Sequence, residues 1–191
     1  TVAAADGNNT SATFKAGVDV TAIVLGNGTG TDTNTVTFDG TAAGYTVAGT
    51  LNGTAGDTDN VVVTGGNTIT TSGIWGANSP VDALSITGTG TKLTAGADIT
   101  ATTVSIASGT TLDADDKIIA SGGITNAGTL DTGADLVTAN IANTGTVLVS
   151  GTGGIQGNIT GAGTLDVNET ATITGNVAGT SADVATGKTL T

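Results

Sequence analysis

The sequence contains no cysteine and no histidine, and its four basic residues are all lysines. Without cysteine there is neither a disulfide framework nor a thiolate metal site, and zinc sites of the His/Cys type are excluded. Without histidine, Ser–His and Cys–His nucleophilic pairs are absent as well. Asp115 and Asp116 are a candidate pair of catalytic carboxylates, but adjacent residues of a strand point to opposite faces. We therefore expect no enzymatic activity.

Positive charge is scarce, because four lysines stand against 16 acidic residues and the formal net charge is −12. Nucleic-acid binding depends on neutralising phosphates with Lys and Arg, so we expect no nucleic-acid partner. The best apolar run, residues 20–25, is too short to cross a bilayer as a helix, and we expect no direct membrane insertion by this segment. An acidic, cysteine-free chain suits an extracellular location, which we predict.

Aromatic residues make up only 2% of the chain and proline occurs once. A core built from this composition must be aliphatic and thin. Glycine (32 residues) and threonine are abundant instead. Thr and Val favour strands, and we expect Gly and Asn to form the corners between strands by adopting positive φ. The composition therefore indicates an all-β protein.

A repeated pattern joins two apolar residues, usually six positions apart, through a turn rich in Gly, Asn and Thr. Its six copies start at Ile86, Ile106, Ile124, Ile141, Ile159 and Val184. Most starts lie roughly 17–20 residues apart, and we interpret the longer last interval as an insertion of about seven residues around 178–183. A spacing of six is unbroken through Ile106, Leu112, Ile118, Ile124, Leu130 and Leu136. It predicts a coil of three short sides and about 18 residues, stacked on its neighbours in a solenoid.

The regular repeat divides the chain into two parts. Residues 84–191 carry it, and residues 1–83 are predicted to be an irregular, β-rich N-terminal part of the solenoid or a cap. Between them, residues 72–82 hold the only tryptophan, Trp75. Our main interpretation is that Trp75 packs as a plug at a transition between coils, and the alternative is an exposed aromatic contact for a sugar or partner.

The copies at residues 124–131, 141–147 and 159–166 resemble the Gly/Thr/Asn-rich coils of bacterial autotransporter passenger domains, in particular the rickettsial outer-membrane surface antigens. Residues 161–176 look like the passenger-associated repeat of that group. The resemblance implies a right-handed parallel β-helix, export across the outer membrane and a surface role. The spacing of six also resembles the left-handed hexapeptide-type β-helix, which is the alternative fold.

This chain departs from a complete autotransporter. It shows no C-terminal membrane barrel, and its first residues lack the charged start and apolar run of a signal peptide. We therefore expect a released or excised passenger portion, or a separate surface protein.

Three functions follow from this interpretation. The first is an extracellular structural or adhesive β-solenoid that contacts host cells or other copies through its surface or ends. The second is a self-assembling surface-layer or filament subunit, because open solenoid ends are unpaired strand edges. The third is ice binding, favoured by an expected ladder of hydroxyls at Thr111, Thr129, Thr146, Thr164 and Thr189.

Two groups of acidic residues are candidates for calcium, the only cofactor the sequence suggests. Asp57 and Asp59 lie in one short turn, and Asp113, Asp115 and Asp116 lie in another. Closely spaced carboxylates supply the oxygen ligands that this hard cation prefers. The alternative is that all five are solvated acids that favour turns.

Overall fold

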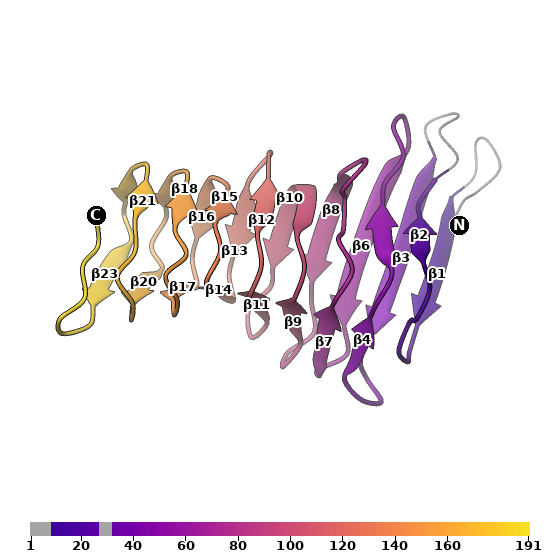
Figure 1. The fold of residues 1–191 in the computed structure, drawn as a ribbon, viewed down its shortest axis with the longest axis horizontal. Helices are drawn as coiled ribbons and strands as arrows, with labels where there is room; N and C mark the ends of the chain where they lie inside the picture. The colour runs from indigo at the N-terminus through magenta and orange to yellow at the C-terminus, as the bar shows by residue number, and fades with distance from the viewer. Residues whose placement is uncertain (1–8, 27–31) are drawn as a thin grey trace.

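The computed structural model describes residues 9–26 and 32–191. Within these ranges there are 23 short strands and no helix, and every strand pair is parallel. The strands stack in chain order along the long axis of a rod (Figure 1). The expected all-β, parallel β-helix architecture is confirmed.

Each coil passes over three sides in turn. Side 1 is formed by β1 (Thr10–Phe14), β3 (Thr33–Asp39), β6 (Thr58–Thr64), β8 (Val81–Ile86), β10 (Ile99–Ile106), β13 (Ile124–Asn126), β16 (Ile141–Asn143), β19 (Ile159–Thr160) and β22 (Val177–Ala178). Side 2 is formed by β4 (Tyr45–Val47), β7 (Thr68–Thr71), β9 (Lys92–Ala95), β11 (Thr111–Ala114), β14 (Thr129–Thr132), β17 (Thr146–Val149), β20 (Thr164–Val167) and β23 (Ser181–Val184). Side 3 is formed by β2 (Ala22–Val24), β5 (Thr50–Asn52), the single residue Trp75, the start of β10, β12 (Ile118–Ala120), β15 (Val137–Thr138), β18 (Ile155–Gln156) and β21 (Ile173–Thr174).

Strand β10 joins two of these sides. Its residues 99–101 pair with β12 on side 3, and its residues 104–106 pair with β13 on side 1. The strand runs around the corner without a break, so side 1 and the later strands of side 3 belong to one hydrogen-bonded sheet of 13 strands. The first two strands of side 3, β2 and β5, form a separate two-stranded sheet. Side 2 remains a separate sheet of eight strands.

The coils become shorter toward the C-terminus. The register on side 1 places the following residues in one column: Ala12, Val36, Val61, Leu84, Val104, Ile124, Ile141, Ile159 and Val177. The sequence separation between neighbours in this column is widest from Ala12 to Leu84, intermediate from Leu84 to Ile124 and narrowest from Ile124 to Val177. The expected coil length therefore describes only the last three coils, and the rod narrows visibly from β3 to β20 (Figure 1).

The core is a set of aliphatic columns, one or two per side. Along each strand inward residues alternate with outward ones, as in Thr33–Asp39, where every second residue is buried. The column of side 2 consists of Ile69, Leu93, Leu112, Leu130, Val147 and Leu165, all fully buried. Burial of each such side chain contributes about 1.5–3 kcal/mol, and the contribution depends on the coils above and below.

The wider N-terminal coils are filled by aromatic rings. Phe14 stacks on Phe38 with ring centroids 5.7 Å apart, and Phe38 stacks on Trp75 at 5.3 Å. Trp75 is fully buried and bridges Leu51 to Ile99 on side 3. The interpretation of Trp75 as a packed plug is confirmed, and the alternative of an exposed aromatic contact is wrong.

The corner between sides 1 and 2 is built differently from our expectation. No non-glycine residue among the described ones has positive φ, so the asparagines do not turn the chain in that way. Instead Asn126 is buried, and its Nδ2 donates to the Asn143 side chain and to the Thr146 carbonyl, both at 2.8 Å. Asn143 donates likewise to the Thr164 carbonyl at 3.0 Å. Each amide therefore closes its corner by binding the next coil.

The register corrects three parts of the sequence alignment. Ile106 pairs with Asn126, and Val104 takes the place next to Ile124. Ile159 pairs with Val177, whereas Val184 belongs to side 2, so the proposed insertion near 178–183 does not exist. Leu136, expected inside, is 39% exposed. The turn before β15 holds one residue more than the turn before β12, so Val137 becomes the inward residue.

Candidate functional site

The outward face of side 2 carries the expected threonine column. Thr111, Thr129, Thr146 and Thr164 are in register, and Ser181 follows them. Thr189 is not part of this column, because it belongs to the stretch that closes the last coil. The column presents hydroxyl groups at the strand spacing of about 4.8 Å.

A second outward column lies two residues further along each strand of side 2. Its members are Thr46, Thr70, Thr94, Asp113, Asp131, Leu148, Asp166 and Asp183. Only β7 carries threonine in both columns, as Thr68 and Thr70, because Lys92 stands beside Thr94. Carboxylates predominate in the second column from β11 onward. The signal of this column in the sequence is the repeated Thr-x-Asp at residues 111–113, 129–131 and 164–166.

Charges on this face interact across the coils. The Lys92 Nζ lies 2.6 Å from Asp113 Oδ2, and this hydrogen bond is the main reason that the pKa of Lys92 is raised. Ser150 Oγ donates to Asp131 Oδ1 at 2.5 Å. Burial, followed by the nearby charge of Asp113, raises the pKa of Asp131 despite that hydrogen bond. From β11 onward the column is thus a line of carboxylates, interrupted at Leu148, with the Lys92 ammonium at its N-terminal end.

The calcium candidates at 113–116 do not face a common point. Asp113 is engaged by Lys92, and Asp115 is exposed. Asp116 Oδ1 accepts the Lys117 N–H at 2.9 Å, while the Lys117 ammonium lies 3.0 Å from Asp98. Burial alone would raise the pKa of Asp98, but the hydrogen bonds and the positive charge of Lys117 lower it overall.

The other calcium candidates lie at the start of β6, with Asp57 in the turn just before the strand and Asp59 as its second residue. The Asp59 side chain is fully buried and accepts hydrogen bonds from Asn34 Nδ2 at 3.2 Å and from the Thr54 N–H at 2.5 Å. Its backbone N–H donates to Asp82 Oδ2 at 2.7 Å. Asp57 is 8% exposed. In residues 9–26 and 32–191 no three His, Cys, Asp or Glu side chains are grouped to hold a metal ion, and calcium binding stays a prediction.

Burial makes Asp59 a source of pH dependence, because it raises the pKa of this carboxyl above its ordinary value. The protonated Asp59 carboxyl is compatible with its buried position, whereas the charged form is not. The stability that this group contributes to the fold is therefore fully present below its unfolded pKa of about 3.9 and is lost as pH rises through the raised pKa. Asp59→Asn removes this loss. We expect its urea midpoint, relative to wild type, to rise between about pH 3 and about pH 7.

Asp39→Asn is the control with the opposite sign. The hydroxyl and N–H of Thr41 donate to Asp39 and lower its pKa, so here stability is present above the unfolded pKa and is lost as pH falls. This variant should therefore lose stability relative to wild type at neutral pH and differ little in acid. If the urea midpoints of Asp59→Asn and wild type changed in parallel with pH, this would contradict a raised pKa for Asp59.

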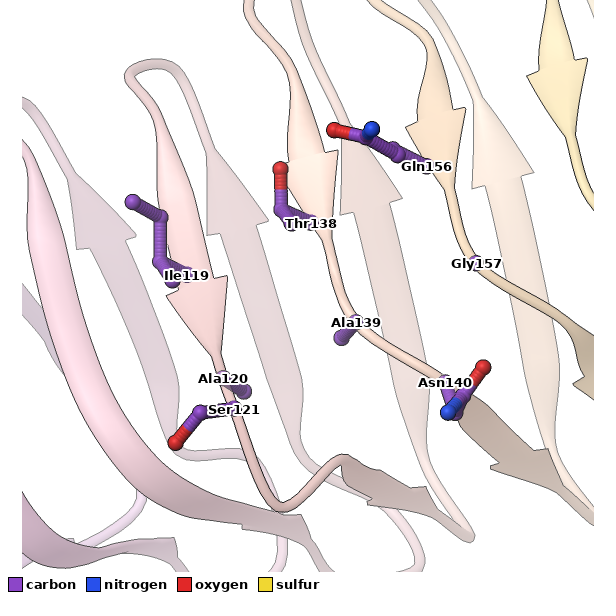
Figure 2. Close-up of a pocket in the computed structure, with 8 residues that line it drawn as sticks. All are labelled: Ile119, Ala120, Ser121, Thr138, Ala139, Asn140, Gln156 and Gly157. Carbon is purple, nitrogen blue, oxygen red and sulfur yellow. The ribbon is translucent and has the colours of Figure 1, made fainter.

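A shallow hollow of about 280 Å³ lies on the outside of side 3 (Figure 2). Ile119, Thr138 and Gln156 form an outward column along it, one from each of β12, β15 and β18. Its other lining residues are Ala120, Ser121, Ala139, Asn140 and Gly157. None of these residues is charged, so the hollow is suited to a small neutral group, such as an uncharged side chain. Nothing in the sequence repeat marked this surface.

All four lysines form ion pairs between neighbouring coils. The pairs are Lys15–Asp39 at 3.8 Å, Lys92–Asp113 at 2.6 Å, Lys117–Asp98 at 3.0 Å and Lys188–Glu169 at 2.7 Å. Each is at least partly solvent-exposed and contributes little to stability. Acidic residues outnumber the lysines by 16 to four, so the lysine pairs leave the surface strongly negative.

No protein-family model, curated protein or solved structure matches this chain. In the part that the structure describes, no helix has the length and apolar character needed to cross a membrane. Evidence for function therefore comes from the surfaces of the rod.

Proposed function

We propose that the protein is a structural and adhesive β-solenoid of the bacterial cell surface, exported as a portion of an autotransporter passenger. The observation that carries this proposal is the outward column Thr111, Thr129, Thr146, Thr164 and Ser181, held in register over five successive coils. A repeating hydroxyl surface on a continuous core can bind an extended or multivalent partner through many weak contacts. The resemblance of the short C-terminal coils to passenger repeats supports the location.

The alternative of a filament or surface-layer subunit requires both ends of the rod to bind other copies. Stacking copies head to tail would place the wide coil that runs from Ala12 to Val36 against the narrow C-terminal coils, such as the one from Ile159 to Val177. Strands of such different coils cannot all remain in register. We therefore place the adhesive role first.

Adhesion is tested with beads coated with the full chain and mixed with host epithelial cells or with bacteria. A triple variant, Thr129→Lys, Thr146→Lys and Thr164→Lys, changes the hydroxyl column of side 2. Lys92 already occupies this column, so the fold should accept lysine there. Because the hydroxyl contacts are lost together, we expect bead binding to fall at least about tenfold.

The matched control changes side 1 in the same three coils, with Thr125→Lys, Ala142→Lys and Thr160→Lys, which are exposed and in register. It adds the same charge and should retain wild-type binding. Circular dichroism of both variants must match wild type. The proposal fails if wild-type beads bind no better than uncoated beads, or if the two variants behave alike.

A further inference from the structure

The hollow on the outside of side 3 is a groove that runs along the rod, and we call it the side 3 groove. Its first wall is the outward column of Ile119, Thr138 and Gln156 (Figure 2). Its floor consists of the next residue of each coil, which is always small: Ala120, Ala139 and Gly157. Its second wall includes Ser121 and Asn140. The groove crosses three coils, so with a strand spacing of about 4.8 Å it is roughly 10 Å long.

The side 3 groove is uncharged, although the chain has a formal net charge of −12. None of its eight lining residues carries a charge. Lys117 lies two residues before Ile119, and its ammonium pairs with Asp98 at 3.0 Å, so these two charges beside the groove largely cancel. A charged ligand would lose water in the groove without gaining an opposite charge. The ligand that fits is therefore neutral.

The polar groups of the groove are available to a ligand. Within the described part of the chain, the side chains of Ser121, Thr138 and Gln156 make no hydrogen bond. Asn140 Oδ1 accepts the Asn158 N–H at 3.0 Å, which fixes the side-chain amide and leaves its Nδ2 to donate. Hydroxyl and amide side chains together offer both donors and acceptors. The groove is therefore suited to a ligand that is itself rich in hydroxyl groups.

We propose that the side 3 groove binds a neutral, linear glycan in an extended conformation, with its chain parallel to the rod. The edges of a sugar ring carry hydroxyls and its faces carry C–H groups. The hydroxyls bind Thr138 and Gln156, while a ring face packs on the half-buried Ile119. One sugar of such a glycan is nearly as long as the strand spacing of about 4.8 Å, so successive sugars meet equivalent positions of successive coils. This inference goes beyond the adhesive role and concerns a different side of the rod, so each proposal can fail without the other.

An extended peptide fits the same groove less well. The backbone groups of the groove already bind between coils, as in Ala139 N to Gln156 O and Gly157 N to Thr174 O, both at 3.0 Å. A peptide lying along the rod would therefore find no backbone partners, and its own N–H and C=O groups would lose water without replacement. A glycan needs only the side-chain groups that the groove provides. The chemistry of the groove thus favours the glycan.

The test is NMR titration of the full, isotope-labelled chain with cellohexaose and with chitohexaose, two neutral glycans that are extended. We expect at least one of them to shift the backbone amide signals of Ile119, Thr138 and Gln156 and to leave those of side 2 unchanged. Because the ligand is neutral, its Kd should be the same at low and high salt. A hexamer of galacturonic acid, which is linear but negatively charged, should not bind.

The double variant Thr138→Val and Gln156→Leu removes the polar groups of the first wall and keeps side chains of similar size. It should weaken glycan binding about tenfold or more, because two hydrogen bonds are lost. The matched control, Thr125→Val and Thr160→Val, removes two hydroxyls from exposed positions of side 1 and should bind like wild type. The proposal is overturned if neither neutral glycan shifts the groove amides, if the charged hexamer or an uncharged Gly/Ser/Thr peptide shifts them more strongly, or if the double variant binds as tightly as its control.

Discussion

Replacing Gly145 by alanine should destabilise the C-terminal coils by about 3 kcal/mol or more. A Cβ at this position would lie 2.1 Å from the Gly128 carbonyl oxygen and 2.7 Å from the Ala127 carbonyl carbon. Both are backbone atoms of the coil before, and the Gly128 oxygen also accepts the Thr146 N–H at 2.8 Å. The backbone at 127–128 cannot move away without breaking this hydrogen bond between the strands. A single added methyl group would therefore push the two coils apart.

Gly→Ala substitutions at two other glycines separate the steric clash at Gly145 from the general effect of replacing a flexible glycine. Gly17 has ordinary φ, and its Cβ would meet nothing closer than Thr46 O at 3.7 Å, so Gly17→Ala should be neutral or slightly stabilising. Gly187 has open space but φ of +79°, so Gly187→Ala should cost about 1–2 kcal/mol. Urea unfolding followed by circular dichroism should give the order Gly145, Gly187, Gly17. An equal effect at Gly145 and Gly17 would refute the steric explanation.

Trp75→Ala should cost about 3–5 kcal/mol, the range for removing a large buried aromatic side chain. The ring is fully buried and stacks on Phe38 at 5.3 Å. Its backbone bonds, from Trp75 N to Asp98 O and from Thr100 N to Trp75 O, do not depend on the side chain. The loss therefore measures packing within the wide N-terminal coils. Thermal and urea unfolding followed by circular dichroism will give its size.

Trp75→Phe separates ring packing from the polar group that tryptophan carries. The indole Nε1 is buried and makes no hydrogen bond in the described structure. Leaving such a donor unpaired costs about 1–3 kcal/mol, and phenylalanine removes it while it keeps an aromatic ring against Phe38. We expect Trp75→Phe to be destabilised by less than half as much as Trp75→Ala. Equal destabilisation would mean that the indole shape, and not ring stacking, holds this part of the core.

The sequence was sufficient to predict the solenoid and the side that repeats most evenly. Leu112 and Leu130 were correctly placed in one column, because β11 and β14 are separated by turns whose total length varies little. The length of the wider N-terminal coils could not be predicted from the sequence, because these coils do not share a common repeat. The same short pattern of an apolar residue, glycine and threonine occurs on more than one side. A shift such as Val177 to Val184 is therefore invisible until strand pairing is known.

The candidate surfaces were less predictable than the fold. The sequence suggests Asp57 and Asp59 as turn residues that are either calcium ligands or solvated acids. Asp59 instead points inward, because the strand alternation that buries Val61 and Val63 also buries it. The hollow at Ile119 depends on how three coils curve together, and no local pattern encodes that curvature. In contrast, the column with Asp113 and Asp131 follows from alternation alone once β11 and β14 are placed.

The pairing of every lysine within the rod has a consequence for how copies meet. Because no lysine is left over, two flanks brought side by side oppose carboxylate to carboxylate along their length, over a range of about 10 Å at 0.1 M salt. Side-by-side packing of copies is therefore opposed by like charge, and this opposition weakens as the salt concentration rises.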